Sequence, residues 1–148
     1  MIKIQIPATS ANLGAGFDAL GLALTYYNYI EMEECDKIDI TAADGLDIPT
    51  DERNLIYISA KDLFAVCGKK LEGLKLIQTS NIPMARGLGS SSACIIAGLV
   101  GANKMLGDPL TKDDLVDLAA QIEGHPDNTA PALLGGIVTA VFDERKVH

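Results

Sequence analysis

Hydrophobic and polar residues alternate at the start of the chain, where isoleucine occupies every second position from 2 to 6. A period of two is typical of a half-buried strand, and Pro7 is expected to end it because proline has no backbone N–H to donate. Residues 22–33 are rich in tyrosine, threonine and isoleucine, which favours a second strand. Residues 38–42 alternate again and lead into Asp44-Gly45, so we expect these two strands to pair as a hairpin.

The rest of the chain changes between helical and extended patterns. Apolar residues recur at helical spacing after Asp51 and stop at Gly68, and glycine commonly ends helices. Residues 93–106 are nearly all apolar or small, which predicts a buried, closely packed helix. The remaining expected elements are a strand over 74–78, a helix from a Thr111 and Asp114 capping box to about Glu123, a short helix capped by Asp127, and a final buried strand over 137–142.

This order of strands and helices is mixed and shows no internal repeat, which indicates the α+β class. A length of 148 residues is that of one ordinary domain that can bury a core. We therefore expect a two-layer domain in which the helices pack on one side of a mixed sheet.

The charge balance and the cysteines exclude several classes of function. Twenty acidic residues against 12 basic residues give a formal net charge of −8, which repels the phosphates of nucleic acids. No stretch reaches the roughly 18 consecutive apolar residues of a membrane-spanning helix. Cys35, Cys67 and Cys94 are odd in number and lack metal-binding spacing, which favours packing roles and a reducing, cytoplasmic location. We expect neither nucleic acid nor a membrane as a partner.

A segment rich in glycine and serine immediately precedes the most apolar helix. Gly87 and Gly89 allow positive φ angles, and the first helical turn offers unpaired N–H donors and the positive end of the helix dipole. The hydroxyls of serines 90–92 can bind phosphate oxygens or Mg²⁺. The segment differs from a P-loop because no lysine follows the second glycine, so metal, dipole and Arg86 would have to meet the charge. The alternative is a glycine turn with a serine N-cap.

Residues 14–19, GAGFDA, match the glycine pattern of dinucleotide sites, but seven residues separate them from the first expected strand and a poor helix follows. We reject that interpretation and expect a ligand loop instead. Asn12 offers a donor and an acceptor, and Asp18 offers a carboxylate for an amine or a hydroxyl. The alternative is that both residues only form turns.

Residues 123–128, EGHPDN, are a third candidate site. Glu123 falls in the last turn of an expected helix, where the dipole disfavours a carboxylate unless a cation lies near, so it is a candidate metal ligand. His125 could donate to an anion, and Asp127 could orient or deprotonate a hydroxyl. The alternatives are a surface histidine, and an Asp127 and Asn128 that only cap the next helix.

Together, the three segments resemble the homoserine kinases of the GHMP kinase superfamily. The resemblance rests on PATSANLGAGFD at 7–18, PMARGLGSSSA at 83–93 and HPDNTAP at 125–131, which occur in the same order. It covers essentially the whole chain and implies that residues 1–148 are the N-terminal, ATP-binding domain of such an enzyme, with the C-terminal GHMP domain absent. The implied fold is the two-layer domain of ribosomal protein S5 domain 2.

The resemblance implies transfer of the γ-phosphoryl group of ATP to the side-chain hydroxyl of L-homoserine, a step in threonine biosynthesis. Asn12, Asp18 and His125 would bind homoserine, and Asp127 and Asn128 would be catalytic, with Asp127 as the candidate base. Phosphoryl transfer needs mainly alignment and charge neutralisation, which these residue types can supply.

The resemblance also assigns the cofactor site. Ser91 and Glu123 would hold Mg²⁺, as the oxygen ligands of a hard cation. The ATP phosphates would be bound by Pro83, Met84, Ala85, Arg86, Gly87, Leu88, Gly89, Ser90, Ser91, Ser92 and Ala93.

The chain departs from the family pattern in three respects. Ala15 stands where proline is usual and Ser92 where alanine is frequent, and neither change removes a ligand. The absent second domain carries a further glycine-rich motif and arginines for the substrate carboxylate, so we expect little turnover without a C-terminal half. Homodimer formation is left open, as are two other functions: a GHMP kinase for another alcohol, and a non-catalytic binding module of the S5 type.

Overall fold

The computed structural model describes residues 1–14, 19–143 and 145–148. Its strands are β1 (Ile2–Ala11), β2 (Leu20–Cys35), β3 (Ile38–Ala42), β4 (Gly73–Thr79), β5 (Ile137–Thr139), β6 (Phe142–Asp143) and β7 (Lys146–Val147). Its helices are α1 (Leu55–Val66), α2 (Ser90–Met105), α3 (Lys112–Glu123) and α4 (Thr129–Leu134).

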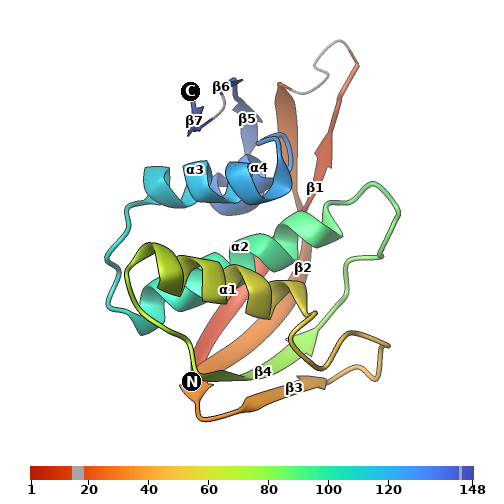
Figure 1. The fold of residues 1–148 in the computed structure, drawn as a ribbon. Coiled ribbons are helices and arrows are strands. Elements are labelled where there is room, and N and C mark those ends of the chain that lie inside the picture. The colour runs from red at the N-terminus through yellow and green to blue at the C-terminus, as the bar shows by residue number, and fades with distance from the viewer. Residues whose placement is uncertain (15–18, 144) are drawn as a thin grey trace.

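A mixed sheet forms one layer of the molecule and the helices form the other (Figure 1). The strand order is β1-β2-β4-β3, and the pairs β1/β2 and β2/β4 are antiparallel whereas β3/β4 is parallel. β5 pairs with the first residues of β2. The expected α+β domain, with its helices on one side of a mixed sheet, is confirmed.

The expected hairpin between residues 22–33 and 38–42 is wrong, because β4 lies between β2 and β3. Leu74 and Leu76 of β4 have no exposed surface, and a position inside the sheet under the helices is what buries them. The backbone N–H of Leu74 donates to the carbonyl oxygen of Lys37 at 2.9 Å. Gly73 permits this approach, since a Cβ there would lie 2.3 Å from the same oxygen.

The first strand does not end at Pro7 but continues to Ala11. β1 is an edge strand, where the missing N–H of proline is tolerated, and its register with β2 shifts between Pro7 and Thr9. Up to this irregularity buried residues alternate along β1, whereas Ala8 and Thr9 are consecutive and both fully buried. The bulge therefore turns Thr9 into the interior.

Two helices begin at side-chain caps. α1 begins at Leu55 rather than near Asp51, because the Oδ1 of Asn54 accepts a backbone N–H of the first turn at 2.9 Å. α3 begins at the expected capping box, in which Thr111 Oγ1 accepts the N–H of Asp114 at 3.2 Å and Asp114 Oδ2 accepts the N–H of Thr111 at 2.8 Å. The box is thus confirmed.

The expected buried strand over 137–142 is wrong in two respects. It is divided into β5 and β6, and β6 pairs with β7 in a separate two-stranded sheet. Ile137 and Val141 are 72% and 65% exposed. β5 pairs with residues 20–22 at the N-terminal end of β2, and two of its three residues, Ile137 and Thr139, are exposed.

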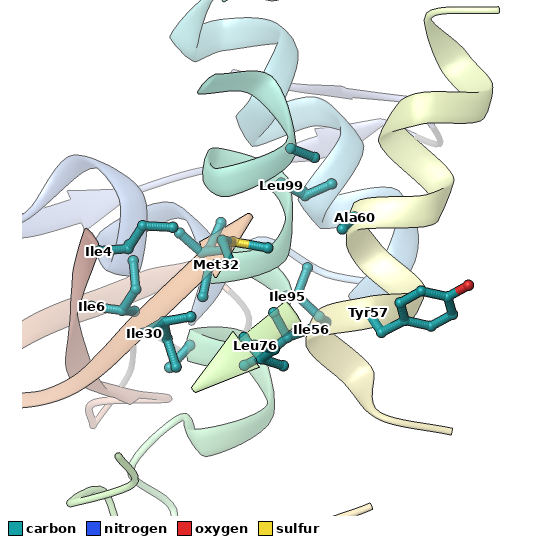
Figure 2. Packing of buried hydrophobic residues seen from close by; sticks show 14 of the residues in the cluster. Ile4, Ile6, Ile30, Met32, Ile56, Tyr57, Ala60, Leu76, Ile95 and Leu99 are labelled. Atoms are coloured by element: carbon teal, nitrogen blue, oxygen red, sulfur yellow. The ribbon is translucent and has the colours of Figure 1, made fainter. Parts of the chain in front are cut away.

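Helix α2 is the centre of the core. Ten of its 16 residues are buried, and it packs against α1, α3, α4, β1 and β2. Figure 2 shows Ile95 and Leu99 of α2 close to Ile56 and Ala60 of α1 and to the apolar side chains of the sheet. Among the residues that the structure describes, no helix is both long and apolar enough to cross a membrane.

Gly98 allows α1 and α2 to pack closely, and its replacement tests this contact. A Cβ at position 98 would lie 2.4 Å from the carbonyl oxygen of Ile56 and 2.8 Å from Ser59 Cβ. A clash with a backbone atom belongs in the upper half of the roughly 1–3 kcal/mol cost of overpacking, about 2–3 kcal/mol, which exceeds the roughly 1 kcal/mol that alanine gains over glycine in helix propensity. We expect urea denaturation to show that Gly98→Ala is less stable by about 1–2 kcal/mol. An unchanged unfolding free energy would contradict the close packing.

Candidate functional site

A cavity of about 540 Å³ lies at the edge of the sheet where β1 and β4 end, beside the first turns of α1 and α2. Its walls come from parts of the chain that are far apart in sequence. They are Ala11 at the end of β1 and Asn12 after it, residues 48–49 and 53–54 before α1 and Leu55 at its start, Gln78 in β4 and Ser80 after it, residues 84–92, Cys94 and Asn128.

The loop before α2 lines this cavity and contains three residues with left-handed backbone conformation. Ala85, Gly87 and Gly89 have positive φ angles of 55°, 70° and 68°. Gly89 is the N-cap of α2, and no side chain caps the helix. The alternative of a serine N-cap is therefore wrong. Because the first four N–H groups of a helix have no partner within the helix, the start of α2 offers hydrogen-bond donors and the positive end of its dipole.

Two guanidinium groups and one thiol also line the cavity. Arg53 already pairs with Asp51, with Nη2 and Oδ2 2.8 Å apart, and Arg86 is the second cation of the wall. Burial, and then the charge of Glu123, raise the pKa of the Cys94 thiol to about 11. The thiol therefore stays protonated at neutral pH, which agrees with a packing role rather than a nucleophilic one.

Glu123 lies at the end of α3, beside the first turn of α2. Its Oε1 accepts hydrogen bonds from Ser91 Oγ at 3.3 Å and Ser92 Oγ at 3.2 Å, both longer than is usual between two oxygen atoms. This position explains a carboxylate in the last turn of a helix, because the positive end of the α2 dipole lies beside it. Carboxylate and hydroxyl oxygens are the ligands of a hard cation such as Mg²⁺. Within the described ranges, no group of three His, Cys, Asp or Glu residues could hold a metal on its own.

Residues 125–128 include a connected group of polar side chains. His125 Nδ1 forms an ion pair with Asp127 Oδ1, and Asp127 is 3% exposed. The same Oδ1 accepts the backbone N–H of Asn128 at 3.1 Å. The expected cap at Asp127 is wrong, because Asn128 occupies the N-cap position of α4 and its side chain makes no capping hydrogen bond. Asn128 Oδ1 instead accepts a hydrogen bond from Thr9 Oγ1 at 2.8 Å.

The structure brings most of the predicted site residues to one place. Residues 84–92 line the cavity together with Asn12 and Asn128, and Pro83 and Ala93 flank that loop. Glu123 accepts hydrogen bonds from two serines of the wall. His125 and Asp127, which precede Asn128 in the chain, pair with each other. Asp18 lies outside the described residues, as does most of the 14–19 glycine motif. Strand β2, and not a helix, follows that motif, which supports rejecting a dinucleotide site.

Two parts of the site were not expected from sequence. The first is the wall formed by Ile48, Pro49 and residues 53–55. Asp44 holds the start of this loop near β4, since its Oδ2 accepts the backbone N–H of Ser80 at 2.6 Å. Hydrogen bonds from the backbone of Ser80 and then Leu46 lower the pKa of the Asp44 carboxyl. The second is Thr9. No local pattern marks either feature, because each depends on contacts between distant segments.

Comparisons with known proteins agree with this geometry. The family model for the N-terminal domain of GHMP kinases matches residues 54–136, more than half of the chain. A homoserine kinase from Carboxydothermus hydrogenoformans is 51% identical over 150 residues, a match that covers 99% of this chain and 49% of that protein. The chain thus spans about half the length of the curated relatives it matches.

Solved structures show the same fold. The homoserine kinase from Cytophaga hutchinsonii superposes with a TM-score of 0.85 at 32% identity, over 99% of this chain and 50% of that one. A phosphomevalonate kinase from Streptococcus pneumoniae, solved with phosphomevalonate and AMPPNP, gives 0.75 at 18% identity, over 97% of this chain and 51% of that one, and shows the fold alone. The match of the family model to more than half of the chain establishes that the protein belongs to the GHMP kinases, in the family defined by their N-terminal domain.

Proposed function

We propose that this chain is the nucleotide-binding half of a homoserine kinase, which transfers the γ-phosphoryl group of ATP to the side-chain hydroxyl of L-homoserine in threonine biosynthesis. The observation that carries the proposal is the cavity in which residues 84–92, the uncapped start of α2, Asn12 and Asn128 face one space. The 51% identity to a homoserine kinase supports homoserine over other alcohols. A localised cavity of this kind in a chain of net charge −8 disfavours a non-catalytic module that binds RNA.

In this proposal the ATP phosphates bind at the start of α2. The helix dipole places the equivalent of roughly half a positive charge there, and the free N–H groups donate to phosphate oxygens. Arg86 adds a cation, and the glycine backbone lets the phosphates approach closely. The nucleobase binds elsewhere in the same cavity, where Ile48, Pro49 and Leu55 supply apolar surface.

Mg²⁺ is proposed to bind between α3 and the start of α2. Glu123 Oε1 and Ser91 Oγ are the proposed ligands, and Ser92 Oγ lies equally close to the same carboxylate. Mg²⁺ commonly takes one or two protein oxygens and completes its shell with phosphate and water, which suits this sparse donor set. Bound there, the ion would neutralise phosphate charge during transfer.

Homoserine is proposed to bind against Asn12, His125 and Asp18. The pair with Asp127 holds the Nδ1 of His125, which leaves Nε2 for the substrate. Asn128 lines the cavity beside the phosphate loop, so its amide can bind the groups that react. Asp127 remains the candidate base: its Oδ1 is engaged by His125 and by the N–H of Asn128, so Oδ2 would accept the hydroxyl proton.

The remaining parts of the proposal concern cellular location, assembly and the second domain. A cytoplasmic location fits the three unpaired cysteines Cys35, Cys67 and Cys94. Assembly as a homodimer stays a prediction, and so does the requirement for a C-terminal GHMP domain.

The activity is tested by release of ADP. We expect negligible homoserine-dependent release from residues 1–148 alone, and release from a joined protein in which this chain precedes the C-terminal half of the Carboxydothermus hydrogenoformans homoserine kinase. Omission of homoserine, or its replacement by mevalonate or galactose, is the control for substrate. A folded joined protein that binds ATP and phosphorylates only another alcohol would contradict the choice of homoserine, and strong turnover by the chain alone would contradict the need for a second half.

Two glycines of the loop provide a matched test of phosphate binding. Gly87 and Gly89 have φ angles of 70° and 68°, so alanine is strained at both positions by about 1–2 kcal/mol. A Cβ at 89 would also lie 2.0 Å from Thr9 Oγ1, whereas one at 87 meets nothing within 4 Å. We expect calorimetry on the joined protein to give a Kd for ATP at least about tenfold weaker for Gly89→Ala than for Gly87→Ala. Equal Kd values for the two variants would mean that backbone strain alone weakens ATP binding, and would contradict a specific role for the close contact at Gly89.

Replacement of Glu123 tests the metal site. Glu123→Gln keeps an acceptor for the two serines but removes the charge that attracts a cation. We expect the Mg²⁺ concentration for half-maximal activity of the joined protein to rise by about 10- to 100-fold, while the melting temperature changes little. Glu72→Gln, at an exposed glutamate that pairs with Lys70, is the control. An unchanged Mg²⁺ requirement in Glu123→Gln would exclude Glu123 as a ligand.

A further inference from the structure

Thr9 is a buried polar residue whose position follows from the bulge in β1. The register shift between Pro7 and Thr9 interrupts the alternation of the strand, so Thr9 follows the buried Ala8 and is itself fully buried. Bulges of this kind often re-aim a side chain next to a functional site. Thr9 is absent from the walls of the cavity, so it does not face the space that we assign to ATP.

Both hydrogen-bond donors of Thr9 bind residues of the cavity wall. Its backbone N–H donates to the carbonyl oxygen of Leu88 at 3.0 Å, and its hydroxyl donates to Asn128 Oδ1 at 2.8 Å. Gly89 packs against the same pair, because a Cβ there would lie 2.0 Å from Thr9 Oγ1 and 3.3 Å from Asn128 Oδ1. One residue of an edge strand thus holds the phosphate loop and Asn128 together.

The side-chain contacts of Asn128 support an orienting role for the hydrogen bond from the Thr9 hydroxyl. Asparagine at an N-cap normally accepts a backbone N–H of its helix, but the side chain of Asn128 makes no such bond in α4. Its carbonyl oxygen is directed to Thr9 instead. The amide is planar, so its Nδ2 is turned away from Thr9, and Asn128 forms part of the cavity wall.

We propose that Thr9 is a positioning residue for phosphoryl transfer: its hydroxyl sets the orientation of the Asn128 amide, and its backbone holds Leu88 and Gly89 in place. This inference rests on the proposed function, because Asn128 is catalytic only if the cavity is the site of transfer. Thr9 touches no substrate and acts through Asn128. A displacement of a reacting group by about 1 Å can reduce a rate by about 100-fold, so a lost orienting bond has a large expected effect.

The kinetic test uses three variants of the joined protein. Thr9→Val keeps the shape of the buried side chain but removes the hydroxyl, and we expect kcat to fall by about 10- to 100-fold with KM for ATP changed by less than about twofold. Thr9→Ser retains the hydroxyl and is expected to recover most of kcat. Thr41→Val makes the same replacement at an exposed position on β3 and should keep the parent kcat. Equal losses of kcat in Thr9→Val and Thr9→Ser would mean a packing role and overturn the proposal.

A mutant cycle shows whether Thr9 acts through Asn128. In an Asn128→Ala background, Thr9→Val should lower kcat little further, because the oriented amide is already absent. Additive losses would overturn the proposal. This comparison also applies to variants whose melting temperatures fall, provided that they are folded at the assay temperature.

A spectroscopic measurement separates this proposal from the proposed function. In the NMR spectrum of residues 1–148, the side-chain NH₂ signal of Asn128 is identified by its loss in Asn128→Asp. We expect Thr9→Val to shift that signal and Thr9→Ser to leave it near the parent position. If the parent joined protein does not phosphorylate homoserine, the proposed function fails while this measurement still decides the orienting bond. A signal that is unchanged in Thr9→Val would overturn the inference whatever the activity.

Discussion

The site depends on one constraint, namely that α2 begins at a left-handed glycine without a side-chain cap. A capped helix would use its first N–H groups internally, whereas this one leaves them to an external acceptor. The start of α2 can be fixed in space because the rest of the helix is the centre of the core. Apolar packing of the helix therefore fixes the position of the loop before it. The anion binding that we propose for this loop would depend on that packing rather than on a network of charged side chains.

Other parts of the site are placed by the same core. α3 packs on α2 and brings Glu123 to the serines of the first turn. α4 packs on α2 and on β1, which brings Asn128 to Thr9. Gly21 contributes as well, since a Cβ there would lie 2.0 Å from the carbonyl oxygen of Asp127 and prevent β2 from approaching this segment. The candidate metal-binding, catalytic and phosphate-binding residues are thus all positioned by packing against α2.

Features that depend on neighbouring residues could be predicted from the sequence. The capping box of α3 and the glycine turns before α2 are of this kind, because the residues that form each feature lie within a few positions of one another. Pairing between distant segments could not be predicted. Alternation in residues 38–42 indicates a half-buried strand but not its neighbour, and so the place of β4 was missed. The inward turn of Thr9 was missed for a related reason, since Pro7 indicated the end of a strand and not a bulge within it.

The insertion of β4 between β2 and β3 also has a consequence for how the chain folds. β2 and β3 are consecutive, yet neither can complete its backbone pairing on its inner side until β4 has been synthesised and inserted, after α1. During translation both strands leave the ribosome with unpaired edges, and such edges attract other chains. The contacts that close the sheet span a long stretch of sequence, which slows folding relative to a simple meander. The charged residues on the outer face of β2, Glu31 and Glu33, would repel a second copy of the same nascent strand during this interval.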